Sequence, residues 1–369
     1  MWPDRRLIDL LKIEHPLVLS PMAGFGTVEL AAAVCASGAL GSIGCGPMSP
    51  EVAAKTIQQL RALTNKPINV NFFCHVSAEV ATAREQAWRD RLSQYHHELG
   101  TDPELSFSRT NLPSFGDDMC AVVEDARPEV VSFHFGLPAQ PLLSRVKAAG
   151  CCVMSSATTV EEALWLEARG VDVVIAQGYE AGGHRATFLS SELNRAMASQ
   201  SGTMALLPQV VDAVSVPVIA AGGIADGRGI AAAFALGATG TQIGTAYLLC
   251  PEAATPPLHR DALRGAGACA TVLTNVFTGR PARALVNRLI REVGPIADAA
   301  PAFPIPIGAS TSLRAAAEKR GSIDFTPLWA GQGSSLGREM PAKALTASLV
   351  TEAIRQFGSL SAIADQPAL

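Results

Sequence analysis

Residues 171–185 read VDVVIAQGYEAGGHR, and this stretch decides the fold prediction. Its start, Val171–Ala176, is almost entirely apolar, which is typical of a parallel strand that is buried on both faces. The strand leads into a polar turn in which Gly182 and Gly183 lack a Cβ, so that the backbone can approach a ligand closely. His184 then adds a side chain whose ordinary pKa lies near neutrality. The stretch therefore predicts a ligand site at the carboxyl end of a buried strand.

The same pattern recurs along the chain from residue 17 to about residue 250. The eight candidate strands are Leu17–Ala23, Ala39–Gly44, Ile68–Phe73, Val130–Gly136, Cys151–Ala157, Val171–Gly178, Pro217–Gly223 and Gly240–Ala246. Helical patterns lie between them, at Pro50–Leu63, Pro138–Ala149, Val160–Ala168, Ala205–Val214 and Gly227–Leu236. Eight such units predict an α/β fold of the (β/α)8, or TIM barrel, type. A doubly wound open sheet is the alternative.

Two segments do not fit this repeat. Residues 77–125 are too long for one helix and its connections, and they predict an insertion between the third and fourth strands. The barrel pattern is complete within residues 1–255. We therefore expect residues 256–369 to form a mostly helical C-terminal appendage that folds over the barrel mouth.

The composition limits the classes of function. The chain has 369 residues, of which 48% are hydrophobic and 17% charged, and its net charge is −4. Without a basic cluster, nothing favours nucleic acid as a partner. No apolar run has membrane-spanning length and no signal peptide is evident, so we expect a soluble, cytoplasmic protein. The eight cysteines show no metal-ligand spacing, and we interpret them as reduced thiols.

Polar residues at the predicted strand ends are the candidates for binding. The loops after the seventh and eighth strands form the usual phosphate site of a barrel, and they contain Gly222, Gly223 and Gln242–Thr245. We expect their backbone N–H groups and the helix N-terminus that follows to form an anion cradle. Asn71 and Gln177 are neutral amides that suit the mixed donors and acceptors of a ring such as isoalloxazine. The alternative is that each amide holds backbone groups in its own loop.

Two histidines are candidates for chemistry. His184 could act as a general base, or its ring could simply hold the turn by hydrogen bonding to the backbone. His134 lies within Phe133–Gly136, where packing or a supporting role is the simpler interpretation. No pair of carboxylates is placed for acid–base work on a glycoside.

Several motifs together resemble the nitronate monooxygenase family, formerly called 2-nitropropane dioxygenases. They are Pro21-Met22-Ala23-Gly24, Val70-Asn71-Phe72-Phe73, Phe133-His134-Phe135-Gly136, Gln177 through Arg185, Ala221-Gly222-Gly223-Ile224, Gln242-Ile243-Gly244-Thr245, Thr274 through Arg283 and Trp329-Ala330-Gly331-Gln332-Gly333. The resemblance covers most of the chain, and its Glu-Ala-Gly-Gly-His element is shared only with flavin-dependent enoyl reductases. It implies a TIM-barrel enzyme that uses FMN.

The resemblance also implies roles for individual residues. The residues implied to bind FMN are Pro21, Met22, Ala23, Asn71, Gln177, Gly182, Gly183, Gly222, Gly223, Gln242, Ile243, Gly244 and Thr245. His184 matches the catalytic histidine of the family, and His134, Trp329 and Gln332 are candidates for the substrate side. The chain departs from the family pattern at Ser20, where alanine is common, and in its long insertion. The resemblance therefore does not determine which residues form the substrate pocket.

The implied reaction is the oxidation of alkyl nitronates or nitroalkanes by O2 to a carbonyl compound and nitrite. Two alternatives remain at this point. One is a reductase on the same barrel that passes electrons from NAD(P)H to a quinone or an enoyl thioester, and the other is a non-catalytic barrel that binds flavin or a phosphate. A homodimer is the candidate assembly, and no metal is expected.

Overall fold

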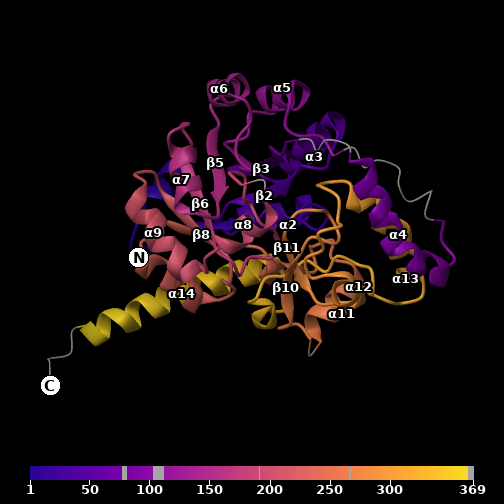
Figure 1. Ribbon diagram of the computed structural model, residues 1–369. Helices are drawn as coiled ribbons and strands as arrows, with labels where there is room; N and C mark the ends of the chain where they lie inside the picture. The colour runs from indigo at the N-terminus through magenta and orange to yellow at the C-terminus, as the bar shows by residue number, and fades with distance from the viewer. Residues whose placement is uncertain (77–80, 103–111, 191, 266, 365–369) are drawn as a thin grey trace.

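The computed structural model describes residues 1–76, 81–102, 112–190, 192–265 and 267–364. Its main sheet has eight parallel strands in the order β1-β9-β8-β6-β5-β4-β3-β2. These strands are β1 (Leu17–Leu19), β2 (Gly41–Gly44), β3 (Ile68–Phe73), β4 (Val130–His134), β5 (Cys152–Ala157), β6 (Val173–Gln177), β8 (Val218–Ala221) and β9 (Gly240–Ile243). A parallel bridge between Val18 and Leu40 joins the two end strands of that order. The sheet is therefore closed into a barrel, which confirms the predicted TIM barrel and excludes the open sheet (Figure 1).

Several strands end earlier than the apolar runs suggested. The run predicted to continue to Gly223 leaves the sheet after Ala221, and Gly222 and Gly223 have φ values of +112° and +73°. An L residue with a side chain rarely adopts such angles, so these glycines turn the chain out of the barrel at the point where the site begins.

Eight helices of the described chain cover the outside of the barrel. They are α2 (Val28–Cys35), α3 (Pro50–Leu63), α5 (Asp117–Ala126), α6 (Gln140–Ala148), α7 (Val160–Glu167), α9 (Thr203–Ala213), α10 (Gly227–Ala235) and α14 (Ala342–Ala364). The last of them, α14, packs against α10 and α2 and so closes the ring of helices. The chain after residue 255 thus contributes a helix of the barrel as well as other elements. The predicted domain boundary at residue 255 remains a proposal.

The other elements include a lobe beside the barrel mouth. It contains α4 (Thr82–Leu99), α11 (Pro257–Arg264), α12 (Arg288–Val293), α13 (Pro306–Lys319) and the strands β10 (Thr271–Thr274) and β11 (Ala282–Leu285). β11 also pairs with β7 (Gly183–His184), which ties the lobe to the loop after β6. Short elements complete the chain: α1 (Arg6–Leu11), α8 (Leu193–Ala198), η2 (Thr245–Leu249) and η3 (Ser334–Leu336).

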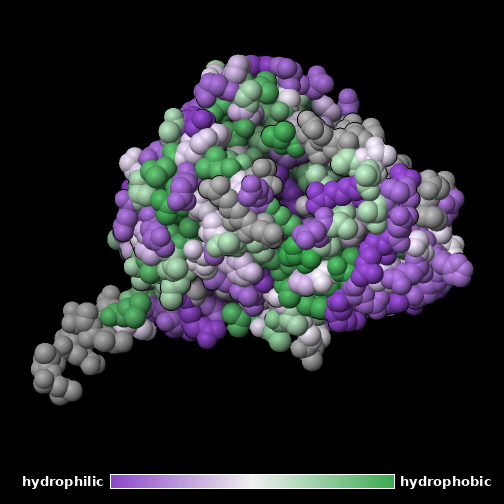
Figure 2. Space-filling model, in the orientation of Figure 1, coloured by the Kyte–Doolittle hydropathy of each residue, from purple (hydrophilic) through white to green (hydrophobic). Residues whose placement is uncertain are grey.

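The segment predicted as one insertion contains two helices that pack in different places. α5 packs between α3 and α6 as the regular barrel helix after β3, whereas α4 packs on α13. Trp88, Leu92 and Tyr95 of α4 share a buried cluster with Leu313 and Phe325. The outward surface of this lobe is largely hydrophilic (Figure 2). Among the described helices of this segment, α5 therefore belongs to the barrel and α4 is additional to it.

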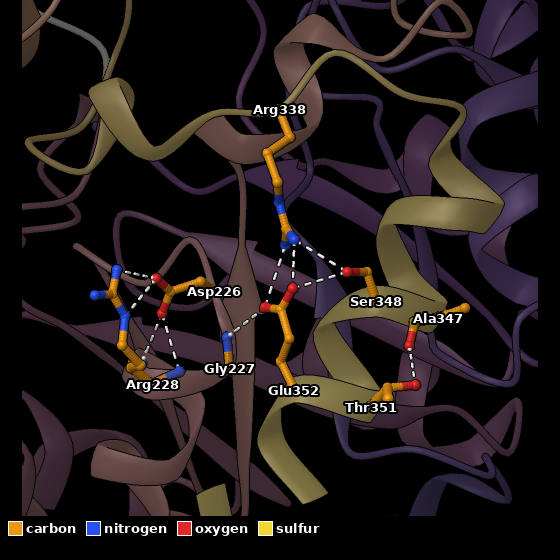
Figure 3. Close-up of polar contacts among 9 residues, drawn as sticks. Asp226, Gly227, Arg228, Arg338, Ala347, Ser348, Thr351 and Glu352 are labelled. Atoms are coloured by element: carbon orange, nitrogen blue, oxygen red, sulfur yellow. Dashed lines mark hydrogen bonds and ion pairs between the residues drawn. The ribbon is translucent and has the colours of Figure 1, made fainter. Parts of the chain in front are cut away.

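A polar network holds α14 against the barrel (Figure 3). Glu352 accepts a hydrogen bond of 3.1 Å from the backbone N–H of Gly227 at the start of α10, and it pairs with Arg338. Ser348 also donates to Glu352 at 2.8 Å.

Within the described chain, no helix is both long and apolar enough to cross a membrane.

Candidate active site

A cavity of about 370 Å³ opens at the carboxyl ends of the barrel strands. The predicted residues that line it are Pro21, Met22, Ala23, Asn71, His134, Gln177, Gly182, Gly183, His184, Gly222, Gly223, Gln242, Gly244, Thr245 and Trp329. Two predicted residues, Ile243 and Gln332, are not among those that line it. Ile243 is buried in the main hydrophobic core, and Gln332 donates its backbone N–H to the Glu180 carbonyl at 2.9 Å.

Close backbone packing forms one wall of the cavity. A Cβ on Gly182 would lie 2.5 Å from the backbone nitrogen of Gly331, and one on Gly222 would lie 3.0 Å from that of Ala181. Thr245 Oγ1 accepts a hydrogen bond of 3.0 Å from the Gly331 N–H. There is therefore no room for side chains at this wall, where four segments meet. They are the loops after β6, β8 and β9 and the segment after Trp329.

Carboxylates occupy the N-terminus of α10, the helix that follows β8. Asp226 accepts from the N–H groups of Arg228 and Gly229 at 2.9 and 3.2 Å, and Glu352 occupies that of Gly227 (Figure 3). Two carboxylates therefore fill the α10 terminus, and the helix N-terminus that remains near the turns is that of η2, which begins at Thr245. In the part of the chain that the structure describes, the N–H groups of Gly223, Ile224 and Thr245 have no acceptor. These groups remain available for an anion.

The three amides at the strand ends are used differently. Gln177 donates to the His184 carbonyl at 3.1 Å and accepts from the Ala186 N–H at 2.9 Å, so it braces its own loop. Asn71 donates to the carbonyl and hydroxyl of Ser132 at 3.1 and 3.0 Å, which leaves its Oδ1 as an acceptor. The Oε1 of Gln242 is buried and has no partner among the described residues. Such an atom is costly unless a ligand donates to it.

His184 lies in the cavity wall as a neutral imidazole. Its Nε2 is 2.9 Å from Thr278 Oγ1, and its ring contacts those of Trp329, Phe303 and Phe135 at centroid distances of 5.5, 5.6 and 5.9 Å. Burial, reinforced by nearby His134, Arg280 and His75, lowers the pKa of His184 to about 3. A neutral ring with one unprotonated nitrogen can accept a proton.

His134 supports this loop. Its Nε2 donates to the His184 carbonyl at 3.3 Å, and burial lowers its pKa to about 3. It also lines the cavity. A supporting role for His134 remains a prediction.

Several residues around His184 were not among the predicted site residues. Phe135 has a φ of +70°, which is uncommon for an aromatic residue, and the Arg280 guanidinium lies 4.1 Å from the centre of its ring. Thr278 and Phe303 line the cavity from the lobe. The stretch Thr274–Arg283 was recognised only as a motif, because its contact with His184 depends on the lobe.

The fold and this site define a barrel enzyme with an anion cradle on one side of a cavity and a neutral histidine on another. The family model for nitronate monooxygenase matches residues 4–352. The chain therefore belongs to the nitronate monooxygenase family, and it is an oxidoreductase.

Individual relatives agree with this assignment. A nitronate monooxygenase of Pseudomonas aeruginosa is 43% identical over 94% of this chain and 98% of its own, and one of Paraburkholderia phytofirmans is 41% identical over 96% and 98%. The structure of a nitroalkane oxidase from Streptomyces ansochromogenes superimposes with a TM-score of 0.86 at 39% identity, covering 96% of this chain and 99% of that one. FabK from Thermotoga maritima superimposes with a TM-score of 0.71 at 29% identity, covering 98% and 100%.

Proposed function

We propose that this enzyme uses FMN to oxidise alkyl nitronates, and nitroalkanes after deprotonation, with O2 to a carbonyl compound and nitrite. The observation that carries the proposal is the neutral His184 in the wall of a cavity that also contains the N–H groups of the anion cradle. The relative from P. aeruginosa, 43% identical, is named for nitronate oxidation.

The residues present fit FMN. The N–H groups of Gly223, Ile224 and Thr245 would hold its phosphate, and the Oε1 of Gln242 and the Oδ1 of Asn71 would accept from polar groups of the cofactor. Pro21, Met22 and Ala23 line the same cavity. Bound there, FMN would supply the electron transfer between the nitronate and O2.

His184 carries the proton chemistry in this proposal. Its unprotonated nitrogen takes the α-proton of a neutral nitroalkane, and the resulting imidazolium holds the charge of the nitronate. A nitronate supplied as the anion needs no such transfer. Phe25, Leu248, Phe277 and Phe303 give the cavity apolar walls that exclude water and suit short alkyl groups.

A cytoplasmic location and a homodimer are part of the same proposal. None of the eight cysteines, all within the described residues, forms a disulfide bond, which suits a reducing compartment. Light scattering on the purified protein tests the dimer.

The main experiment mixes the FMN-loaded enzyme with propyl-2-nitronate. Without O2, we expect the nitronate to reduce the yellow flavin, and with O2 we expect acetone and nitrite. An unchanged flavin spectrum refutes the reaction, and a colourless protein that takes up no FMN refutes the cofactor. If NADH bleaches the flavin without O2 and the nitronate does not, the enzyme is a reductase.

A further inference from the structure

We infer that Thr278 is a positioning residue that fixes the tautomer of His184 and thereby makes Nδ1 the nitrogen that accepts the substrate proton. This inference rests on the proposed function, because it concerns the same histidine. Thr278 itself has no titratable group and acts only through His184.

The lobe brings Thr278 to the barrel loop. Thr278 lies in the connection between β10 and β11, and β11 pairs with β7 so that Ala282 is opposite His184. The hydroxyl of Thr278 is consequently 2.9 Å from His184 Nε2, although the two residues are far apart in sequence. Thr278 is 5% exposed, so water cannot readily replace this contact.

The hydrogen bonds around the hydroxyl select one tautomer. Thr278 Oγ1 lies 3.3 Å from the carbonyl oxygen of Arg280, to which it can donate, and 3.4 Å from the N–H of Arg280, from which it can accept. If His184 carries its proton on Nε2, the hydroxyl accepts from His184 and from the Arg280 N–H and donates to the Arg280 carbonyl. If the hydroxyl instead donates to Nε2, the Arg280 carbonyl loses its donor. The first arrangement makes three hydrogen bonds and the second makes two, so the Nε2–H tautomer is favoured.

This tautomer leaves Nδ1 as the free nitrogen of a ring that lines the cavity. No residue of the described ranges forms a hydrogen bond with Nδ1. When Nδ1 takes a proton, the bond from Nε2–H to Thr278 is unchanged, so the protein need not rearrange during the transfer. The charged or titratable groups around His184 are His134, His75 and Arg280, and none of them is an anion that could compete for this proton.

Nuclear magnetic resonance of the FMN-loaded enzyme with ¹⁵N-labelled histidine tests the tautomer directly. The chain has seven histidines, and the variant His184→Asn identifies the signals of His184 by their loss. In the wild type we expect Nε2 to be protonated and Nδ1 unprotonated. Thr278→Val, which keeps the shape but removes the hydroxyl, should give a mixture of tautomers, and Thr278→Ser should restore the wild-type signals. A wild-type ring protonated on Nδ1, or an unchanged tautomer in Thr278→Val, overturns the inference.

A kinetic comparison separates this role from simple support of the fold. Thr278→Val should lower kcat/KM for neutral nitroethane by about tenfold, the worth of one hydrogen bond, and change kcat/KM for ethylnitronate by less than about twofold. Thr278→Ser is the matched control and should behave as the wild type. Equal losses on both substrates would show a structural role and refute the inference. If the wild type oxidises neither substrate, the proposed function fails, whereas the tautomer measurement still decides the role of Thr278.

Discussion

Arg280 offers a quantitative test of the electrostatics around His184. Its guanidinium is half-buried, stacks on Phe135 and donates to the Thr187 carbonyl, and it forms no ion pair with any carboxylate of the described residues. The guanidinium carbon lies 4.1 Å from the centre of the Phe135 ring, which lies 5.9 Å from that of His184. The imidazole and the cation are therefore at most about 10 Å apart, the sum of these two distances.

The magnitude follows from this separation. At an effective dielectric constant of about 20, two unit charges 10 Å apart interact by about 1.7 kcal/mol. If an anion binds beside His184 at a comparable distance from Arg280, it gains a similar amount. Replacing Arg280 with glutamine should therefore weaken the binding of nitrite about fifteenfold.

Replacing Arg280 with glutamine weakens the binding of an anion but favours the charged form of His184. Loss of a positive neighbour makes the imidazolium less costly, so the pKa of His184 rises by about one unit from its value of about 3. Because the base must be unprotonated, the acid limb of kcat/KM for nitroethane should move to higher pH by the same amount.

Flavin absorbance during nitrite titration measures the affinity, and initial rates across pH measure the limb. Arg280→Lys keeps the charge but loses the planar stacking, and its affinity for nitrite should remain within about threefold of the wild type. Nitrite affinity that is unchanged in Arg280→Gln would refute the assignment of a long-range charge effect to this residue.

Three further predictions concern the histidines and the loops. His184→Asn should reduce turnover of neutral nitroethane far more than it reduces FMN content, and equal turnover would remove His184 from the role of base. Gly182→Ala places a Cβ 2.5 Å from the Gly331 nitrogen and should lower the free energy of unfolding by about 1–3 kcal/mol, measured in urea. Gly183→Ala is its control, since a Cβ there meets no atom within 4 Å and only the φ of +70° costs about 1 kcal/mol. Equal losses of unfolding free energy in the two variants would contradict the steric explanation. Finally, the pKa values of His184 and His134 are near 3 in the folded state, below the ordinary 6.5. The unfolded chain then binds more protons between these values, so the stability contribution is full above pH 6.5 and falls as the pH drops toward 3. The Tm of His184→Asn should fall less than that of the wild type between pH 8 and pH 5, and parallel curves would show that His184 does not contribute.

Local interactions account for the features that were predicted well. The helix Pro50–Leu63 was predicted with the bounds that the structure shows, because Ser49 accepts from the Val52 N–H and proline occupies the first turn. The buried strands are recognisable because parallel strands are apolar on both faces. The glycines of the site could be found because a turn with positive φ restricts the residue type locally.

Other features depended on partners distant in the chain. The sequence left open whether Gln177 binds a ligand or braces its loop, and the structure shows that its amide holds the backbone at His184 and Ala186. From the sequence, the N-terminus of α10 could bind an anion. In the structure, the Gly227 N–H at this terminus donates to Glu352, which is 125 residues away in the chain.

The sequence by itself determined the eight buried strands, the turns that follow them and the residue types at their ends, because each depends on burial periodicity or on the backbone freedom of one residue. Only the tertiary structure decided that α14 completes the helix ring, that α4 belongs to the lobe and that Thr278 contacts His184. The physical reason is that a hydrogen bond or a packed face between residues 94 positions apart leaves no periodic signal in the chain. Such contacts depend on the β7–β11 pairing, which joins the lobe to the loop after β6.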